Sequence, residues 1–311
     1  MRVGWLVLSR FILLTAGLLL CTPSWAASVL VLLSDKSAPY QEVADGFRAQ
    51  LQHDRPDVNV AVEASLAHAE NALPADTRLL VSVGMKATQA ALALDTRIPI
   101  LAVLVPKDSF DAVIAPFNEE HRPISAIYLD QPYSRQLGLI RLAFPERERV
   151  GVLLREQDRQ KLGTLLAAAR LQKVQVINEL IPNGGEIVPS LERLLAASDL
   201  LLVLPDALLY NKNDIQGVLL TSYRYRDPVV GYSQALVRAG AIMALYSKPA
   251  QIGYQAAEMA LRSLNTGTLP ASQYPKYFTV SVNQQVARSL NIPVPDEIGL
   301  QQALQRWEQE Q

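Results

Sequence analysis

Residues 199–210, DLLLVLPDALLY, contain a continuous apolar run from Leu200 to Leu204 that stops at Pro205 and Asp206. The run is too short to cross a membrane, which takes about 20 apolar residues. A short apolar run ended by turn residues is typical of a strand buried on both faces, as in a parallel sheet covered by helices. In open α/β sheets ligands bind beyond the carboxyl ends of the strands, so we expect Asp206 to lie at a binding crevice.

Outward from this stretch, similar apolar runs alternate with segments of helical period. The predicted strands are 28–33, 58–62, 79–83, 99–105, 124–129, 149–154, 174–180, 200–204, 229–231, 241–246 and 277–282. The predicted helices are 40–51, 86–94, 133–143, 159–171, 187–197, 212–223, 234–238, 249–264 and 283–290. This alternation predicts right-handed βαβ units in an α/β fold with two Rossmann-like lobes, each built on a parallel sheet.

Length and charge limit the classes of partner. The chain has 311 residues, enough for two domains of ordinary size, and its 29 basic residues nearly balance its 30 acidic residues. Nucleic-acid binding needs a basic face, so we expect no nucleic-acid partner. The sequence shows no metal-ligand spacing and no cofactor motif, and we expect neither a metal nor a cofactor.

The first 26 residues have the features of a cleaved signal peptide. Arg2 and Arg10 supply a positive region, residues 11–20 an apolar region, and residues 24–26 a small-x-small cleavage site. The mature chain is predicted to begin near Ala27 in the periplasm. Cys21 is the only cysteine and stands in a poor lipobox, so a lipoprotein is the less favoured alternative.

Polar side chains at the predicted strand ends are the candidate ligand-binding residues, because these ends face the crevice. Each has a plainer alternative as a cap, a loop hydrogen bond or a solvated surface group. The candidates are Ser34, Asp35, Lys36 and Tyr40 after the first strand, Gly84, Met85 and Lys86 after the third, and Arg155, Asp206, Tyr232 and Ser233 in the second half. Lysine and arginine at these ends would attract an anion.

Residues 231–235, GYSQA, share the Gly-x-Ser order between a predicted strand and a predicted helix with the nucleophile elbow of hydrolases. The second glycine of that motif is replaced by Ala235. All three histidines precede Ser233, whereas the hydrolase order places histidine last. We therefore expect no catalytic residues and no enzyme activity.

Several stretches resemble the periplasmic substrate-binding proteins of ABC transporters, the branch that includes tryptophan- and tyrosine-binding members. They are GYSQALVRAGAIMALYSKPAQIGYQAAEMALRSLNTGTLP at 231–270, RVGVLLR at 149–155, LLLVLPD at 200–206 and NQQVARSLNIPVP at 283–295. The sequence differs from the family where Met85 replaces a polar residue and Ala207 replaces asparagine. These differences remove a polar contact to an amino-acid carboxylate, so we expect the fold of the family but not tryptophan or tyrosine as the solute.

The resemblance implies a type I periplasmic binding fold whose chain crosses between lobes near 129–132, 248–249 and 269–275. The N-terminal lobe would comprise 27–130 and 249–270, the C-terminal lobe 131–248 and 271–300, with a loosely held polar tail at 301–311. The implied function is capture of an amino-acid-like solute or small organic anion, with an ABC permease and ATPase as partners. The alternative is a periplasmic sensory or accessory protein of the same fold that presents its ligand state to a membrane receptor such as a histidine kinase.

Overall fold

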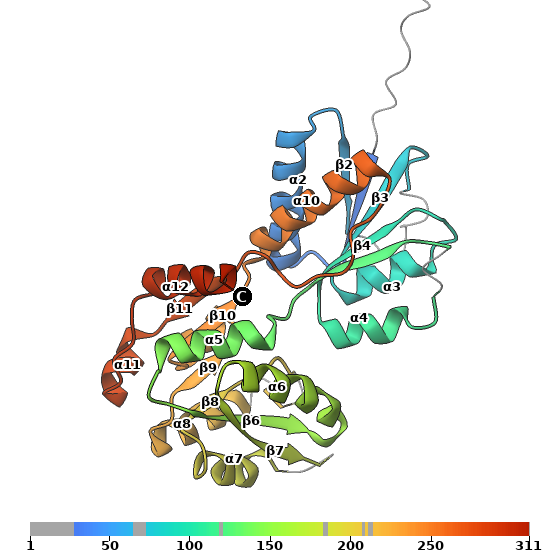
Figure 1. The fold of residues 1–311 in the computed structure, drawn as a ribbon. Coiled ribbons are helices and arrows are strands. Elements are labelled where there is room, and N and C mark those ends of the chain that lie inside the picture. The colour runs from blue at the N-terminus through green and yellow to red at the C-terminus, as the bar shows by residue number, and fades with distance from the viewer. Residues whose placement is uncertain are drawn as a thin grey trace, which may run out of the picture.

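The computed structural model describes residues 28–64, 73–117, 121–182, 186–206, 209–210 and 214–310. It has two lobes (Figure 1), one on a five-stranded sheet in the order β2-β1-β3-β4-β5 and one on a six-stranded sheet in the order β11-β10-β9-β8-β6-β7. The named strands pair in parallel except β10 with β11. This arrangement confirms the predicted fold class. The predicted signal peptide, 1–26, lies outside the described residues.

The first lobe combines an N-terminal block with one late helix. Its strands are β1 (Ser28–Leu33), β2 (Asn59–Glu63), β3 (Thr77–Val83), β4 (Ile100–Val105) and β5 (Ile124–Tyr128). Its helices are α2 (Ala38–Asp54), α3 (Met85–Ala93), α4 (Lys107–Ile114) and α10 (Pro249–Thr266). Helix α4 was not among the predicted elements, because Pro106 ends a strand and only one turn of clear pattern follows it.

The second lobe follows the same plan with one added strand. Its strands are β6 (Arg149–Arg155), β7 (Gln175–Ile181), β8 (Leu200–Leu202), β9 (Val229–Gly231), β10 (Met243–Tyr246) and β11 (Thr279–Val282). Its helices are α5 (Tyr133–Ala143), α6 (Arg159–Leu171), α7 (Ile187–Leu195), α8 (Asp214–Tyr225), α9 (Gln234–Ala239), α11 (Gln284–Leu290) and α12 (Glu297–Gln309), with a 3₁₀ turn at Glu156–Asp158. Strand β8 is shorter than the predicted run, whose remaining residues lead to Asp206 without regular secondary structure.

Alternate residues of β1 explain why the first sheet needs helices on both faces. Val29 and Val31 pack in one apolar cluster with Phe47 of α2 and with α10. Leu30 and Leu32 pack in another cluster with α3 and α4 on the opposite face. A strand with no polar side is stable only when both faces are covered, which is the parallel-sheet arrangement that its sequence predicts.

Helices α2 and α10 approach each other closely enough to require glycine. A Cβ at Gly253 would collide with the backbone of Val43 and Phe47, and a Cβ at Gly46 would lie 2.9 Å from the carbonyl oxygen of Ala250. The late helix α10 therefore packs backbone against backbone on the first lobe, although its neighbours in sequence belong to the second.

Helix α12 is held more firmly than the polar sequence of 301–311 indicated. Leu300 and Leu304 are buried in the same core cluster as α5, and the ring of Trp307 covers Gly138. The helix packs on α5 and β11, and two of its polar residues also bond inward, Gln301 to the backbone N–H of Val280 and Glu308 to Arg135. The expectation of a loosely held tail was therefore wrong for residues 301–309.

Candidate functional site

Two adjoining cavities lie between the lobes, at the carboxyl ends of the strands. The first has a volume of about 280 Å³ and the second of about 350 Å³. Asp130, Gln131, Gln136 and Pro205 line both, so the cavities meet at the segment that joins β5 to α5. A solute that occupied both would contact both lobes.

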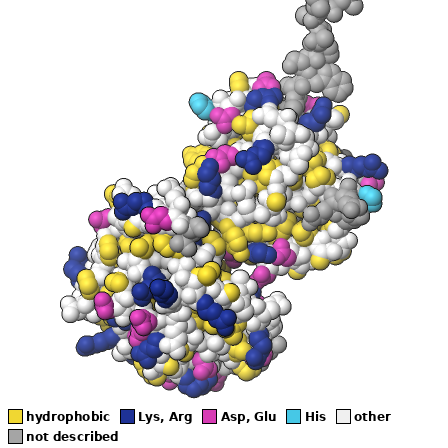
Figure 2. Space-filling view, in the orientation of Figure 1, with side chains coloured by type: hydrophobic (Ala, Val, Ile, Leu, Met, Phe, Trp, Pro, Cys, Tyr) yellow, Lys and Arg dark blue, Asp and Glu magenta, His cyan; other side chains and the backbone are white. Residues whose placement is uncertain are grey.

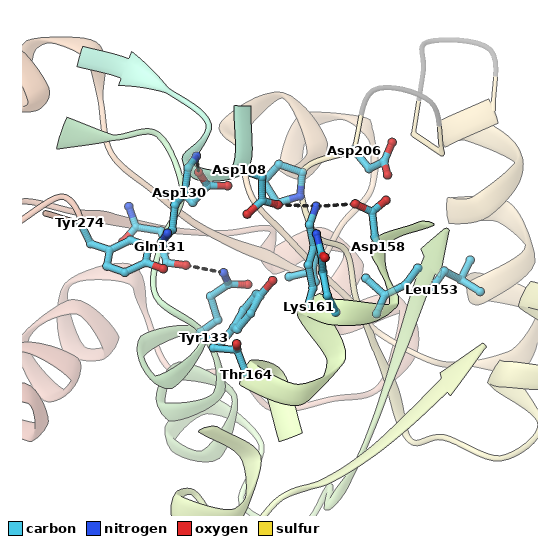
Figure 3. A pocket seen from close by; sticks show the side chains of 16 residues that line it. Asp108, Asp130, Gln131, Tyr133, Leu153, Asp158, Lys161, Thr164, Asp206 and Tyr274 are labelled. Atoms are coloured by element: carbon cyan, nitrogen blue, oxygen red, sulfur yellow. Dashed lines mark hydrogen bonds and ion pairs between the residues drawn. The ribbon is translucent and has the colours of Figure 1, made fainter. Parts of the chain in front are cut away.

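The first cavity is lined by charged groups from four segments (Figure 3). Lys161 of α6 lies between two carboxylates, with its Nζ 2.7 Å from Asp108 of α4 and 2.9 Å from Asp158. Arg155, at the end of β6, forms ion pairs with Asp158 at 2.8 Å and with Asp206 at 2.6 Å. The contact between Lys161 and Asp108 joins the second lobe to the first.

The pairing determines the charge of Lys161. Burial favours the neutral amine, but the hydrogen bonds to Asp108 and Asp158 outweigh it, so the pKa of Lys161 is raised. The lysine is therefore a cation whose charge is already shared by two carboxylates.

Asp130 occupies the boundary between the cavities. One carboxylate oxygen accepts a hydrogen bond of 2.7 Å from the backbone N–H of Lys107. Burial raises the pKa of Asp130, and the negative charge of Asp108 adds to the rise. A carboxylate in this position gains from any cation that enters the cleft.

Tyrosine rings flank the same boundary. Tyr133 and Tyr274 line the first cavity, and the Tyr274 ring packs edge-on against Tyr128 with centroids 5.3 Å apart. Burial raises the pKa of Tyr133 to about 12, so its hydroxyl is neutral and available as a hydrogen-bond donor.

The second cavity is mainly apolar. Tyr40, Tyr232 and Tyr246 line it together with leucines from both lobes, and Ser233 lies at its rim as the N-cap of α9. One of the leucines, Leu104, has a φ of +57° beside a register shift in β4. This backbone conformation costs on the order of 1 kcal/mol for a residue with a side chain. Backbone strain of this kind clusters at active sites and ligand-binding sites. The cavity suits an apolar or aromatic group.

A buried hydrogen-bond network connects the three segments that pass between the sheets. Gln131 Nε2 donates to Ser247 Oγ at 2.9 Å, and Ser247 Oγ donates to the Tyr277 carbonyl at 2.6 Å. Arg135 Nη1 donates to Gln131 Oε1 and to the Pro275 carbonyl, each at 2.7 Å. The network ties the three segments into one unit, so rotation of the lobes would involve all three together.

The structure brings some of the predicted site residues to the cavities. Asp206 lines the first, Tyr40, Tyr232 and Ser233 line the second, and Arg155 pairs with Asp206 beside the first. Asp206 also accepts a hydrogen bond from the backbone N–H of Leu209 at 3.2 Å, so the loop and the ion pair both hold its carboxylate.

The other predicted residues make local contacts outside the cavity linings. Ser34 donates to the Val83 carbonyl and accepts from the backbone N–H of Ala87, which joins β1 to β3 and α3. Gly84 has a φ of +84° and leaves space for the Tyr40 ring. The remainder are exposed or pack on the first lobe: Asp35 accepts from the backbone N–H of Ser37, Lys36 and Lys86 are exposed, and Met85 packs on the α3–α4 side of the sheet.

The sequence reasoning missed most of the charged lining. Lys107 and Asp108 follow Pro106 at the end of β4, so the rule that selected Asp206 would have selected them too. Asp130 and Gln131 were recognised only as a crossing segment. Asp158, Lys161 and Tyr274 follow no strand directly, and no local signal marks them.

The part of the chain that the structure describes also bears on two other kinds of site. It contains no group of histidine, cysteine, aspartate and glutamate side chains arranged to hold a metal ion. None of its helices is long and apolar enough to span a membrane. On the visible face, acidic and basic side chains are interspersed over both lobes (Figure 2).

Comparison with known proteins places this geometry in a family. Solved structures with the same fold include an ABC domain in complex with L-Trp from Streptococcus pneumoniae, with 16% identity, a TM-score of 0.57, and coverage of 86% of this chain and 96% of that one. A ligand-free, open substrate-binding protein with adhesive properties from Clostridium difficile has 16% identity, the same coverage and a TM-score of 0.70. A conserved domain protein from Vibrio cholerae has 18% identity, a TM-score of 0.57, and coverage of 87% and 96%.

These likenesses, all at low identity, establish the fold. No curated protein sequence matches the chain. The model of the family described as "ABC transporter substrate binding protein" matches residues 49–305. That match covers most of both lobes, and the chain therefore belongs to the ABC transporter substrate-binding protein family.

Proposed function

We propose that this protein captures a small solute between its two lobes and delivers it, chemically unchanged, to an ABC permease and its ATPase. The observation that carries the proposal is the pair of cavities that meet at Asp130 and Gln131. One is charged and the other is apolar, and each draws its lining from both lobes. A solute held there would favour the closed arrangement, because it gains contacts with both lobes only when they approach.

The three connecting segments are proposed as the hinge. They are 129–132, the turn at Ser247 and Lys248, and 274–278, and the buried network of Gln131, Ser247 and Arg135 supports this role. A few residues in such segments can absorb a rotation while the lobes stay rigid. We further propose that the mature chain begins near Ala27 and works in the periplasm, where a permease could receive the solute.

A thermal-shift screen tests solute capture. The mature protein would be heated with aromatic and branched amino acids, small organic anions, nucleosides and sugars. A solute present at 100 times its dissociation constant should stabilise the protein by about 2.7 kcal/mol, enough to move the midpoint visibly.

Matched tyrosine variants show whether binding occurs in the cleft. Tyr232→Ala removes a ring from the second cavity, whereas Tyr254→Ala removes an exposed ring from α10, outside either cavity. We expect the first variant to lose the shift and the second to keep it. A panel without any shift, or equal shifts in the two variants, would contradict capture between the lobes.

The sensory alternative uses the same cleft with a different partner. Pull-down from membranes with the ligand-loaded protein separates the two roles, because recovery of a permease supports transport and recovery of a receptor kinase supports sensing. Transport is the role proposed here, since the chain belongs to a transporter-associated family.

A further inference from the structure

A third cavity lies on the first lobe, away from the cleft between the lobes. Its volume is about 580 Å³. It is lined where β3 and β4 begin, by residues 77–78 and 96–99, and where α10 ends, by Ser263, Leu264 and Gly267. Helix α10 leads from the second lobe to this far end of the first (Figure 1). The cleft lies at the carboxyl ends of the strands, so this cavity is at the opposite edge of the sheet, about 20 Å away along a strand of seven residues.

The charged side chains that line this cavity are all arginines. Arg78 and Arg97 are exposed, and within the described residues neither forms an ion pair or a side-chain hydrogen bond. The acidic residues nearest to them in sequence, Asp76 and Asp95, are not among the lining residues. The cavity therefore has two positive charges and, among its described lining residues, no carboxylate to neutralise them.

Three hydroxyl groups add hydrogen-bond donors to the same lining. Ser263 is only 7% exposed, yet its hydroxyl has no hydrogen-bond partner within the described residues. The Thr77 hydroxyl accepts a hydrogen bond from Ser28 at 3.3 Å, and the Thr96 hydroxyl accepts one from the backbone N–H of Ile98 at 3.2 Å. A hydroxyl that accepts still has its own proton to donate. A nearly buried hydroxyl without a partner is uncommon in proteins, and its position in this lining favours an acceptor that enters the cavity.

The end of α10 opposes an anion only weakly. The C-terminus of a helix carries a partial negative charge of about half a unit. In α10 the backbone N–H of Gly267 donates to the Ser263 carbonyl, so one of the last carbonyl groups already has a partner. The two guanidinium charges outweigh this half charge, and the lining as a whole favours an anion.

The remaining lining residues provide apolar surface. Ile98 and Pro99 precede β4, and Leu264 belongs to the last turns of α10. A free phosphate ion would leave most of this cavity unfilled, whereas a phosphate ester could place its organic part against the three apolar side chains. The combination of cations, hydroxyls and apolar surface favours the ester.

We propose that this cavity is a second binding site and that its ligand is a phosphate ester. Arg78 and Arg97 bind the phosphate oxygens, because the planar guanidinium group matches phosphate with two parallel hydrogen bonds. The Ser263 hydroxyl donates to the same phosphate, and the organic part lies on the apolar side of the lining. The site is separate from the cleft, and its existence does not depend on solute capture.

Phenyl phosphate is the first probe, because it joins a phosphate to an apolar ring. Isothermal titration calorimetry into the mature protein, near neutral pH and in a buffer free of phosphate, should show saturable binding of phenyl phosphate. Inorganic phosphate, which lacks the ring, should bind more weakly. Both affinities should fall as salt is added, because exposed charges are screened.

Matched variants show whether the binding occurs in this cavity. Arg78→Gln and Arg97→Gln each remove one charge from an exposed side chain and should each weaken phenyl phosphate binding at least about tenfold, the loss of one charge-assisted hydrogen bond. Ser263→Ala removes a neutral donor and should weaken binding by about two- to tenfold. Arg288→Gln makes the same charge change at an exposed position of α11, outside all three cavities, and should leave binding unchanged.

Flotation with lipid vesicles distinguishes the two sources of such an ester. The protein would be mixed with vesicles of phosphatidylcholine alone or with added phosphatidic acid, whose head group is a phosphate monoester. Recruitment only by phosphatidic acid, lost in Arg78→Gln and Arg97→Gln, would identify a lipid head group as the ligand. Phenyl phosphate binding without recruitment to either vesicle would identify a soluble ester.

Three results would overturn the proposal. Absence of both phenyl phosphate binding and vesicle recruitment would remove the site. Equal affinity in the parent and in both arginine variants would place the binding elsewhere, and a lower thermal midpoint in these variants with unchanged affinity would show that the arginines only stabilise the end of α10. Inorganic phosphate binding as tight as phenyl phosphate binding would overturn the ester as ligand. Capture in the cleft stands or falls separately, because it is tested with other solutes and with Tyr232→Ala.

Discussion

The ion pair between Lys161 and Asp108 should hold the lobes together in the absence of solute. It joins α6 of the second lobe to α4 of the first at 2.7 Å. Replacing Lys161 by methionine keeps an aliphatic side chain of similar length and removes the charge. We expect Lys161→Met to shift the population toward a wider separation of the lobes.

The size of this population shift follows from the solvent exposure of the two paired side chains. The Lys161 side chain is 23% exposed and that of Asp108 is 56% exposed, so water screens the pair substantially. Such pairs contribute about 0.5–1 kcal/mol, which corresponds to a change of about two- to fivefold in the ratio of open to closed molecules. The shift should shrink further at high salt, because exposed ion pairs are screened.

Double electron–electron resonance, a pulsed electron paramagnetic resonance method, measures this ratio through the distance between two spin labels. Labels on cysteines introduced by Asp45→Cys and Leu171→Cys would report the separation, since both positions are exposed and lie on different lobes. The sequence from Ala27 onward, the proposed mature chain, contains no cysteine to interfere. The distance distribution of Lys161→Met should gain weight at long distances relative to the parent.

Two controls isolate the interlobe contact. Asp108→Asn breaks the same ion pair from the other side, and the double variant should open no further than either single variant if the two residues act through each other. Arg193→Met removes an ion pair to Glu179 within the second lobe and should change nothing between the lobes. Unchanged distances in both single variants at low salt would refute the reasoning.

Three further predictions concern packing, pH and the hinge. Gly253→Ala should destabilise the first lobe by about 1–3 kcal/mol, because the added methyl group collides with the backbone of Val43. The control is Gly163→Ala, whose methyl group has no atom within 4 Å. Equal thermal midpoints for the two variants would contradict the prediction. Burial raises the pKa of Asp227 from 3.8 to about 6. Between these pH values the folded state binds more protons than the unfolded chain, so the free energy of unfolding falls as pH rises. The total fall is at most about 3 kcal/mol. Asp227→Asn should therefore be more stable than the parent above pH 6, an advantage absent at about pH 4 in calorimetry, and parallel pH profiles would contradict this. Arg135→Met should lower the free energy of unfolding by about 3–5 kcal/mol, measured by calorimetry, because it leaves Glu308 and Gln131 without their buried partner. A loss of stability below about 1 kcal/mol would show that the network is not cooperative.

The sequence predicted most elements of the fold because their signals are local. Apolar runs such as 28–33 are strands with both faces buried, and β9 and α5 begin and end at the predicted residues. The antiparallel partner of β10 could not be predicted in the same way, since the direction of a last strand depends on how the chain returns from the other lobe. Burial of α12 was missed because Leu300, Leu304 and Trp307 are few among many polar residues.

The candidate site was only partly predictable for a related reason. Strand-end rules found Asp206 and Tyr232, whose positions follow from their own strands. The pairing of Lys161 with Asp108 depends on how two lobes face each other, and no spacing in one chain segment encodes that. The role of Arg155 as a partner of Asp206 likewise required both side chains to be seen together.

The close packing of α10 on α2 constrains the order in which the protein can fold. The inner face of α2 lacks its partner until the ribosome has made the chain as far as Thr266. At about 5–20 residues per second, synthesis from Asp54 to Pro249 takes roughly 10–40 s. During that interval the second sheet acquires β6 to β10 while Val43 and Phe47 remain without α10 to cover them. The lobe that begins the chain therefore waits longer than the second lobe between the synthesis of its first and last core elements, and its nascent form is the one that chaperones would be expected to bind.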